Sequence, residues 1–111
     1  MIQRTLISFL VLIGLCITTA SAQTPSERGQ KVYTEQKCSI CHSLAGVGNK
    51  KGALDGIGAK LSADQIRQWI TDAPAMAAKA KTDRKPVMKA YPNLPKDELD
   101  ALVTYLQSLK S

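Results

Sequence analysis

Two cysteines and a histidine stand together in the segment Cys38-Ser39-Ile40-Cys41-His42. Thiols three positions apart on a helical turn face the same way, so each can add to one of the two vinyl groups of a porphyrin. The imidazole that follows is then held beneath the iron as a ligand. The spacing therefore predicts one covalently bound haem c, with Cys38 and Cys41 as its thioether links and His42 as the proximal iron ligand.

Three other kinds of site use cysteines at a similar spacing. A structural zinc site needs four ligands, whereas the chain after residue 22 offers two cysteines and one histidine. A redox pair of the thioredoxin type would follow a strand, and none is predicted before Cys38. A structural disulfide has no need of His42. We therefore favour a haem over a zinc ion, a redox dithiol or a disulfide.

The second axial position of such an iron has few candidate ligands. His42 is the only histidine in the sequence, so ligation by two histidines of this chain is excluded. A methionine thioether is the soft, neutral alternative. Met76 and Met88 both follow the motif, and residue type alone leaves the choice between them open.

Short helices are expected to position these residues. Capping-box patterns at Thr24 and Ser62 predict helices over about 25–36 and 63–72. Apolar residues at helical spacing predict a last helix between 95 and 109, with Pro95 in its first turn.

Glycines and prolines separate the predicted helices. Residues 43–60 contain five glycines and residues 73–92 contain three prolines, so both segments are expected to be irregular. No segment alternates at period two, and no sheet is predicted. The expected fold is all-α, with three to four short helices and glycine-rich loops wrapped around the haem.

The N-terminus has the composition of a secretory signal peptide. Arg4 precedes an apolar run over residues 6–17, and Ala20-Ser21-Ala22 forms a cleavage site of the A-x-A type. The run is shorter than the roughly 20 residues that cross a bilayer, so we favour cleavage after Ala22 over an uncleaved anchor, and no stable membrane span is expected. The signal peptide would be residues 1–22, and the mature domain, residues 23–111, would be periplasmic.

The chain is basic and small. Its 111 residues allow a single domain, and its net charge is +6. One cluster of cations surrounds Met88 and comprises Lys79, Lys81, Arg84, Lys85 and Lys89. This cluster is either a solvated surface or a docking face for acidic redox partner proteins. No aromatic residues are interleaved with the cations, which argues against nucleic acid as a partner.

Taken in order, these segments resemble a small bacterial class I cytochrome c along nearly all of residues 23–111. The features that match are Gly29 and Tyr33 in the first helix, the CSICH motif, the stretch ALDGIG over 53–58, Trp69, and MKAYPNL over 88–94 before a helix with Tyr105. The resemblance implies the cytochrome c fold, with a 23–111 cytochrome c domain around one haem c.

The resemblance also implies roles for particular residues. Met88 would be the distal iron ligand, with Met76 as the alternative. Trp69 would face a haem propionate with its indole N–H, with a core aromatic as the alternative role, and the carbonyl of Gly52 would accept the ring N–H of His42. The sequence departs from the family pattern at two of these places. Lys89 replaces the proline that usually follows the methionine, and Lys51-Gly52 replaces Gly-Pro.

For function, the resemblance implies a periplasmic carrier of single electrons that is not itself an enzyme. It would act as a monomer, or as a dedicated haem subunit of a larger periplasmic oxidoreductase. A haem ligand sensor or weak peroxidase with an open iron is a third hypothesis. The electron donor and acceptor do not follow from the sequence.

Overall fold

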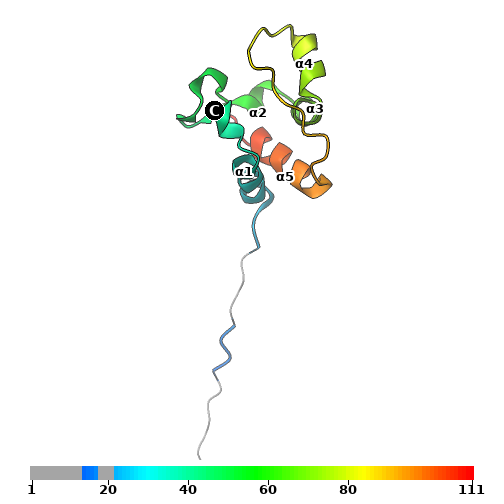
Figure 1. Ribbon diagram of the computed structural model, residues 1–111. Coiled ribbons are helices and arrows are strands. Elements are labelled where there is room, and N and C mark those ends of the chain that lie inside the picture. The colour runs from blue at the N-terminus through cyan, green and yellow to red at the C-terminus, as the bar shows by residue number, and fades with distance from the viewer. Residues whose placement is uncertain (1–13, 18–21) are drawn as a thin grey trace, which may run out of the picture.

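The computed structural model describes residues 14–17 and 22–111, and its ribbon is drawn in Figure 1. Most of the signal peptide expected over residues 1–22 lies outside the described residues, which include only 14–17 and 22 of it. Among the residues described, no helix is long and apolar enough to cross a membrane. The elements are α1 (Pro25–Glu35), η1 (Cys38–Ile40), β1 (Ser43–Leu44), β2 (Val47–Gly48), η2 (Lys50–Gly52), α2 (Ile57–Lys60), α3 (Ala63–Thr71), α4 (Ala73–Ala80) and α5 (Lys96–Gln107), where η denotes a 3-10 helix.

The helices predicted from the sequence are present, and their N-termini show why they begin where they do. The Thr24 hydroxyl accepts a hydrogen bond from the Glu27 backbone N–H at 3.1 Å and caps α1. At α3 the capping box is complete, because Ser62 and Gln65 each accept from the other's backbone N–H, at 3.2 and 2.9 Å. Helix α5 begins at Lys96, directly after Pro95. The all-α fold class is confirmed.

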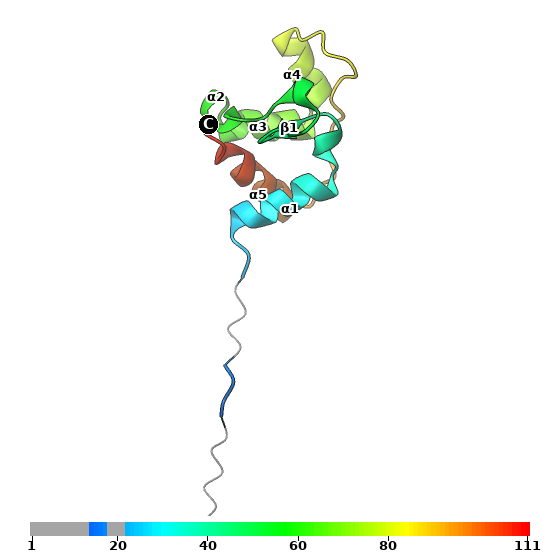
Figure 2. The same cartoon turned by 90° about the vertical axis from the view of Figure 1, so that its left-hand side faces the viewer.

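Helices α1 and α5 cross in close contact. The crossing point is Gly29, where a Cβ atom would come closer than 3.0 Å to the Ala101 carbonyl and to Tyr105 Cβ. One turn further along α1, the ring of Tyr33 meets that of Tyr105 edge-on, with centroids 6.1 Å apart. Figures 1 and 2 show α4 at the end of the domain opposite to α1.

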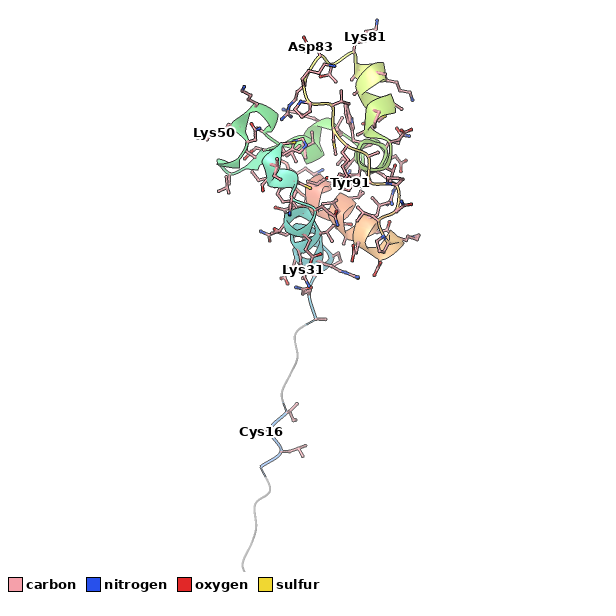
Figure 3. The ribbon with its side chains drawn as sticks, viewed as in Figure 1. Cys16, Lys31, Lys50, Lys81, Asp83 and Tyr91 are labelled. Atoms are coloured by element: carbon pink, nitrogen blue, oxygen red, sulfur yellow. The ribbon has the colours of Figure 1, made fainter. Side chains whose placement is uncertain are left out.

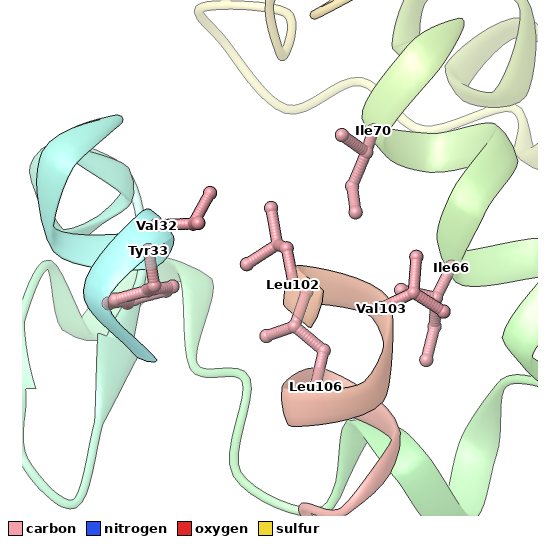
Figure 4. Packing of buried hydrophobic residues seen from close by; sticks show 7 residues of the cluster. All are labelled: Val32, Tyr33, Ile66, Ile70, Leu102, Val103 and Leu106. Atoms are coloured by element: carbon pink, nitrogen blue, oxygen red, sulfur yellow. The ribbon is translucent and has the colours of Figure 1, made fainter. Parts of the chain in front are cut away.

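The core lies between α1, α3 and α5. Each of these helices turns buried aliphatic side chains inward, as Figure 4 shows. They are Val32 of α1, Ile66 and Ile70 of α3, and Leu102, Val103 and Leu106 of α5.

Two expectations about the loops were wrong. Residues 73–80 were expected to be irregular but form α4, since Pro74 lies in the first turn, where its missing N–H is not needed, and alanines of high helix propensity follow. The absence of a sheet was also wrong. Strands β1 and β2 form an antiparallel hairpin whose turn residues, Ala45 and Gly46, both have positive φ. Strands of two residues are too short to show an alternating pattern.

With α2 and α4, the described part of the chain has five α-helices rather than three to four. Helix α2, a single turn of four residues, follows Gly56, whose φ is +74°. The glycine-rich segment was expected to consist of loop and turns, and α2 is one helical turn within it.

Candidate functional site

A cavity of about 520 Å³ is lined by residues of helices α1 to α5 and brings most of the candidate residues together. Its size is in the range of cofactor sites. Aliphatic side chains such as Leu54, Ile57 and Leu102 make up much of its wall. The candidate site residues that line it are Cys38, Cys41, His42, Gly52, Trp69 and Met88.

The cysteines reach this cavity because the chain folds into a tight turn after α1. Lys37 adopts a left-handed conformation, with φ 56°, and ends the first helix. The N–H groups of Cys41 and His42 then both donate to the Cys38 carbonyl, at 3.1 and 2.9 Å. Both thiols are free and half-buried. Burial raises the pKa of Cys38 to about 11, so this thiol is neutral at neutral pH.

His42 is oriented by a single backbone group. Its Nδ1 atom lies 2.9 Å from the Gly52 carbonyl, to which the ring N–H donates. The other ring nitrogen, Nε2, is then the one with a free lone pair. Burial lowers the pKa of His42, the bond to Gly52 acts against this, and the positive charge of Arg84 lowers it further. The imidazole is therefore neutral at neutral pH, the form that binds metals.

Gly52 is packed too closely to carry a side chain. It is buried, and a Cβ atom there would overlap both the Cys41 carbonyl oxygen and the guanidinium group of Arg84. Only glycine leaves room for the chain to pass between these groups. The place of Gly52 beside His42 thus follows from its lack of a side chain.

Arg84 was expected to belong to an exposed basic cluster, but the structure places it at the cavity. Its guanidinium group is half-buried, lines the cavity and donates to the Cys41 carbonyl. Sequence reasoning missed this role. The residue type was the signal that could have revealed it, because Arg84 is the one arginine in a cluster of lysines. The planar fork of donors of an arginine suits contacts with backbone carbonyls better than an ammonium group does.

The two candidate methionines lie in different surroundings. Met88 lines the cavity from the irregular segment after α4. Met76 is half-buried on α4 and does not line it. Trp69, on α3, lines the cavity as well. The segment with Met88 is held against the end of α3 by a bond from the Tyr91 N–H to the Ile70 carbonyl at 2.8 Å.

Tyr33 is a cavity residue whose hydroxyl was not singled out from the sequence. Its side chain is 8% exposed, and among the described residues its hydroxyl has no hydrogen-bond partner. Burial is the main cause that raises its pKa to about 12. An apolar cavity with two free thiols, a histidine, a methionine and one unpartnered hydroxyl fits a flat, largely apolar group with two points of attachment and a metal at its centre. These residues fit a haem.

The lysines of the basic cluster lie outside the cavity. Lys79, Lys81, Lys85 and Lys89 are exposed. Lys81 and Asp83 lie together at the outer end of the loop after α4 in Figure 3. The Lys89 ammonium lies 5.2 Å from the centroid of the Tyr91 ring. Within residues 14–17 and 22–111, no group of three or more His, Cys, Asp or Glu side chains could hold a metal ion without the porphyrin.

Comparison with known proteins gives one family. The family model described as cytochrome c matches residues 26–110 of the chain. A similar protein is "Cytochrome c oxidase subunit 2" of Alkalihalophilus pseudofirmus, which is 28% identical over 97 residues. That match covers 79% of this chain but only 27% of the relative. No solved structure matches the chain significantly.

Proposed function

Because the chain belongs to the cytochrome c family and carries a covalently bound haem c, we propose that it transfers single electrons between periplasmic redox partners. The family supports a haem electron-transfer role in general terms. The observation that carries the finer proposal is the shared cavity, which Cys38, Cys41 and His42 line together with Met88. With one thioether and one imidazole available, an iron held there would have both axial positions filled by protein.

In this proposal each site residue has a defined task. Cys38 and Cys41 attach the haem, which supplies an iron that gains or loses one electron. The Gly52 carbonyl holds the Nδ1 proton of His42 and so keeps Nε2 available as the proximal ligand. Met88 would offer a neutral thioether to the iron, and Trp69 would offer its indole N–H to a haem propionate. The apolar wall around them favours the less charged, reduced state.

Exposed lysines support a partner of opposite charge. Lys79, Lys81, Lys85 and Lys89 lie on the segments that lead to and from Met88. A positive surface beside the site would speed the encounter with an acidic protein, in a manner that weakens with salt. The N-terminal sequence, with its cleavage site after Ala22, supports export to the periplasm, which is also where a class I cytochrome c with a signal peptide would meet such partners.

A second candidate function is a haem subunit of a larger oxidoreductase. The observation that favours it is the likeness to a relative whose name is that of an oxidase subunit. Purification from the periplasm in high salt separates the two candidates. A partner that stays bound in a fixed ratio supports the subunit, whereas a free monomer supports the carrier.

The visible and near-infrared spectrum of the oxidised protein tests the proposed site. We expect low-spin haem with a sulfur-to-iron charge-transfer band, lost in Met88→Ala and kept in the matched variant Met76→Ala. Loss of the band in Met76→Ala alone would transfer the ligand role to Met76. A high-spin spectrum of the wild type would contradict the carrier and favour the third hypothesis, a ligand sensor or peroxidase.

The lysine surface has its own test. Replacing Lys79, Lys81 and Lys85 by glutamine should slow electron transfer to an acidic partner protein and flatten the salt dependence of the rate. Replacing Lys31, Lys50 and Lys96 by glutamine removes the same charge from exposed lysines outside the cluster and is the control. If the triple variant and the wild type respond to salt alike, the lysines are simply solvated surface.

A further inference from the structure

Arg84 contacts the backbone on both sides of His42. Its guanidinium group donates to the carbonyl of Cys41, 43 positions earlier in the sequence. The same group packs against Gly52, where a Cβ atom would overlap it. Gly52 in turn accepts the hydrogen bond from His42 at 2.9 Å. The Arg84 side chain therefore contacts two backbone groups that set the position of the imidazole, the Cys41 carbonyl and Gly52.

Arg84 also belongs to the segment that carries Met88. The N–H of Thr82 donates to Ala77 at 3.2 Å and that of Arg84 to the Thr82 hydroxyl at 3.3 Å, which ties this segment to the end of α4. The next anchor is the Tyr91 N–H, bonded to Ile70 at 2.8 Å. Within the described structure, residues 85–90 make no hydrogen bond between these two points. We call residues 85–90 the span. In the described structure it is held by hydrogen bonds at its two flanking residues, Arg84 and Tyr91, and Met88 lies between them.

The contact with Cys41 is well suited to hold such a span. A hydrogen bond from a charged donor is stronger than one between neutral groups. The guanidinium is half-buried, so solvent screens it less than an exposed cation. One donor of its fork reaches Cys41 while the guanidinium nitrogens lie against Gly52, and the single ammonium of a lysine could not make both contacts.

We propose that Arg84 is a positioning residue that fastens the segment carrying Met88 to the backbone that orients His42. The mechanical part of this inference rests on the contacts alone, and its consequence for the iron rests on the proposed function. Loss of the contact frees the span on the Arg84 side, so that Met88 leaves its position more often. Arg84 accordingly acts through Met88 and Gly52.

Three variants of the haem-loaded protein test the inference. Arg84→Met removes the charge and the donors at similar length, and Arg84→Lys keeps the charge without the fork. Lys50→Met is the matched control, because Lys50 is an exposed cation that lies at the outer end of the neighbouring loop in Figure 3. None of these substitutions removes a proposed iron ligand or the cysteines.

Trypsin provides the first measurement, which does not depend on the iron. Lys89 is exposed in the span, whereas Lys31 lies within α1 and becomes cleavable only as that helix unfolds. Loss of one charged hydrogen bond should raise cleavage after Lys89 by at least about tenfold in Arg84→Met, relative to cleavage after Lys31. Arg84→Lys should lie between Arg84→Met and the wild type, and Lys50→Met should match the wild type.

Imidazole binding to the oxidised protein provides the second measurement. Imidazole competes with Met88 for the iron, so its apparent affinity should rise by at least about tenfold in Arg84→Met. In a Met88→Ala background, Arg84→Met should add nothing. If Met88→Ala alone leaves imidazole affinity unchanged, the proposed ligand is wrong, while the trypsin ratio still reports on Arg84.

An unchanged ratio of cleavage after Lys89 to cleavage after Lys31 in Arg84→Met would overturn the inference. An equal rise at both sites would mean that Arg84 contributes only to the stability of the whole domain. A Lys50→Met variant as labile as Arg84→Met would show that charge, and not the contact with Cys41, is what matters.

Discussion

The buried hydroxyl of Tyr33 should make the stability of this protein depend on pH in the alkaline range. It lies in the cavity wall, and its pKa is raised to about 12, chiefly by burial. An unfolded chain has a tyrosine pKa of about 10. Because the folded pKa is the higher one, the contribution of this group to stability is complete below about pH 10 and is lost as the pH rises from there towards 12.

Tyr33→Phe should abolish this part of the pH dependence. We expect the wild type to lose stability, relative to Tyr33→Phe, between neutral pH and pH values above about 10. Denaturant unfolding of both proteins at the two pH values measures the difference. The other ionisable groups are common to both proteins and cancel in the comparison. Equal losses in the two proteins would show that Tyr33 ionises as freely in the folded as in the unfolded chain.

Other residues of the site show how far the sequence alone reaches at this scale. Cys38, Cys41 and His42 could be identified because their chemistry is contained in five consecutive residues. The inward position of Arg84 could not, since its partner Cys41 is 43 positions away and neighbouring lysines suggest a surface. The missing partner of the Tyr33 hydroxyl is likewise a property of the folded interior.

At the scale of the elements, the sequence predicted those whose signals are local. Helices α1, α3 and α5 have caps or an apolar stripe, and they appear where expected. Helix α4 was missed because Pro74 suggested a break, although a proline in the first turn is compatible with a helix. The hairpin of β1 and β2 depends on a turn of two residues with positive φ and has no periodic signal.

The crossing of α1 and α5 offers a direct test of packing between elements. Gly29→Ala would place a methyl group closer than 3.0 Å to the Ala101 carbonyl and to Tyr105 Cβ, and neither is a flexible side-chain end. The helices must move apart, so we expect a loss of about 1–3 kcal/mol in the free energy of unfolding. Urea unfolding of the haem-loaded protein measures it.

The control for this test is the next residue along the same helix. Gln30 is exposed, and Gln30→Ala leaves the crossing intact. Alanine has the higher helix propensity, so Gln30→Ala should be neutral or slightly stabilising. A Gly29→Ala variant as stable as Gln30→Ala would mean that α1 and α5 can separate without cost, and the close contact would then have no structural importance.

On the scale of the whole molecule, the cavity and the core share the same walls. Ile66, Ile70, Leu102 and Leu106 belong to the buried cluster and also line the cavity. A cavity of about 520 Å³ in so small a domain leaves these side chains without packing partners on one side. The haem that the family carries is therefore expected to complete the core as well as to move electrons.

Removing the attachment points should consequently unfold the domain. In the double variant Cys38→Ser and Cys41→Ser, the haem is no longer held covalently, and small domains without such a staple are marginal. We expect loss of most of the helical circular dichroism and of the cooperative thermal transition seen in the wild type. Ser39→Ala, between the two cysteines, is the matched control and should keep both, because the backbone carbonyl of Ser39, and not its hydroxyl, accepts the bond from Asn49. A double variant that still unfolds cooperatively would show that α1, α3 and α5 form a sufficient core by themselves, and the haem would then serve electron transfer alone.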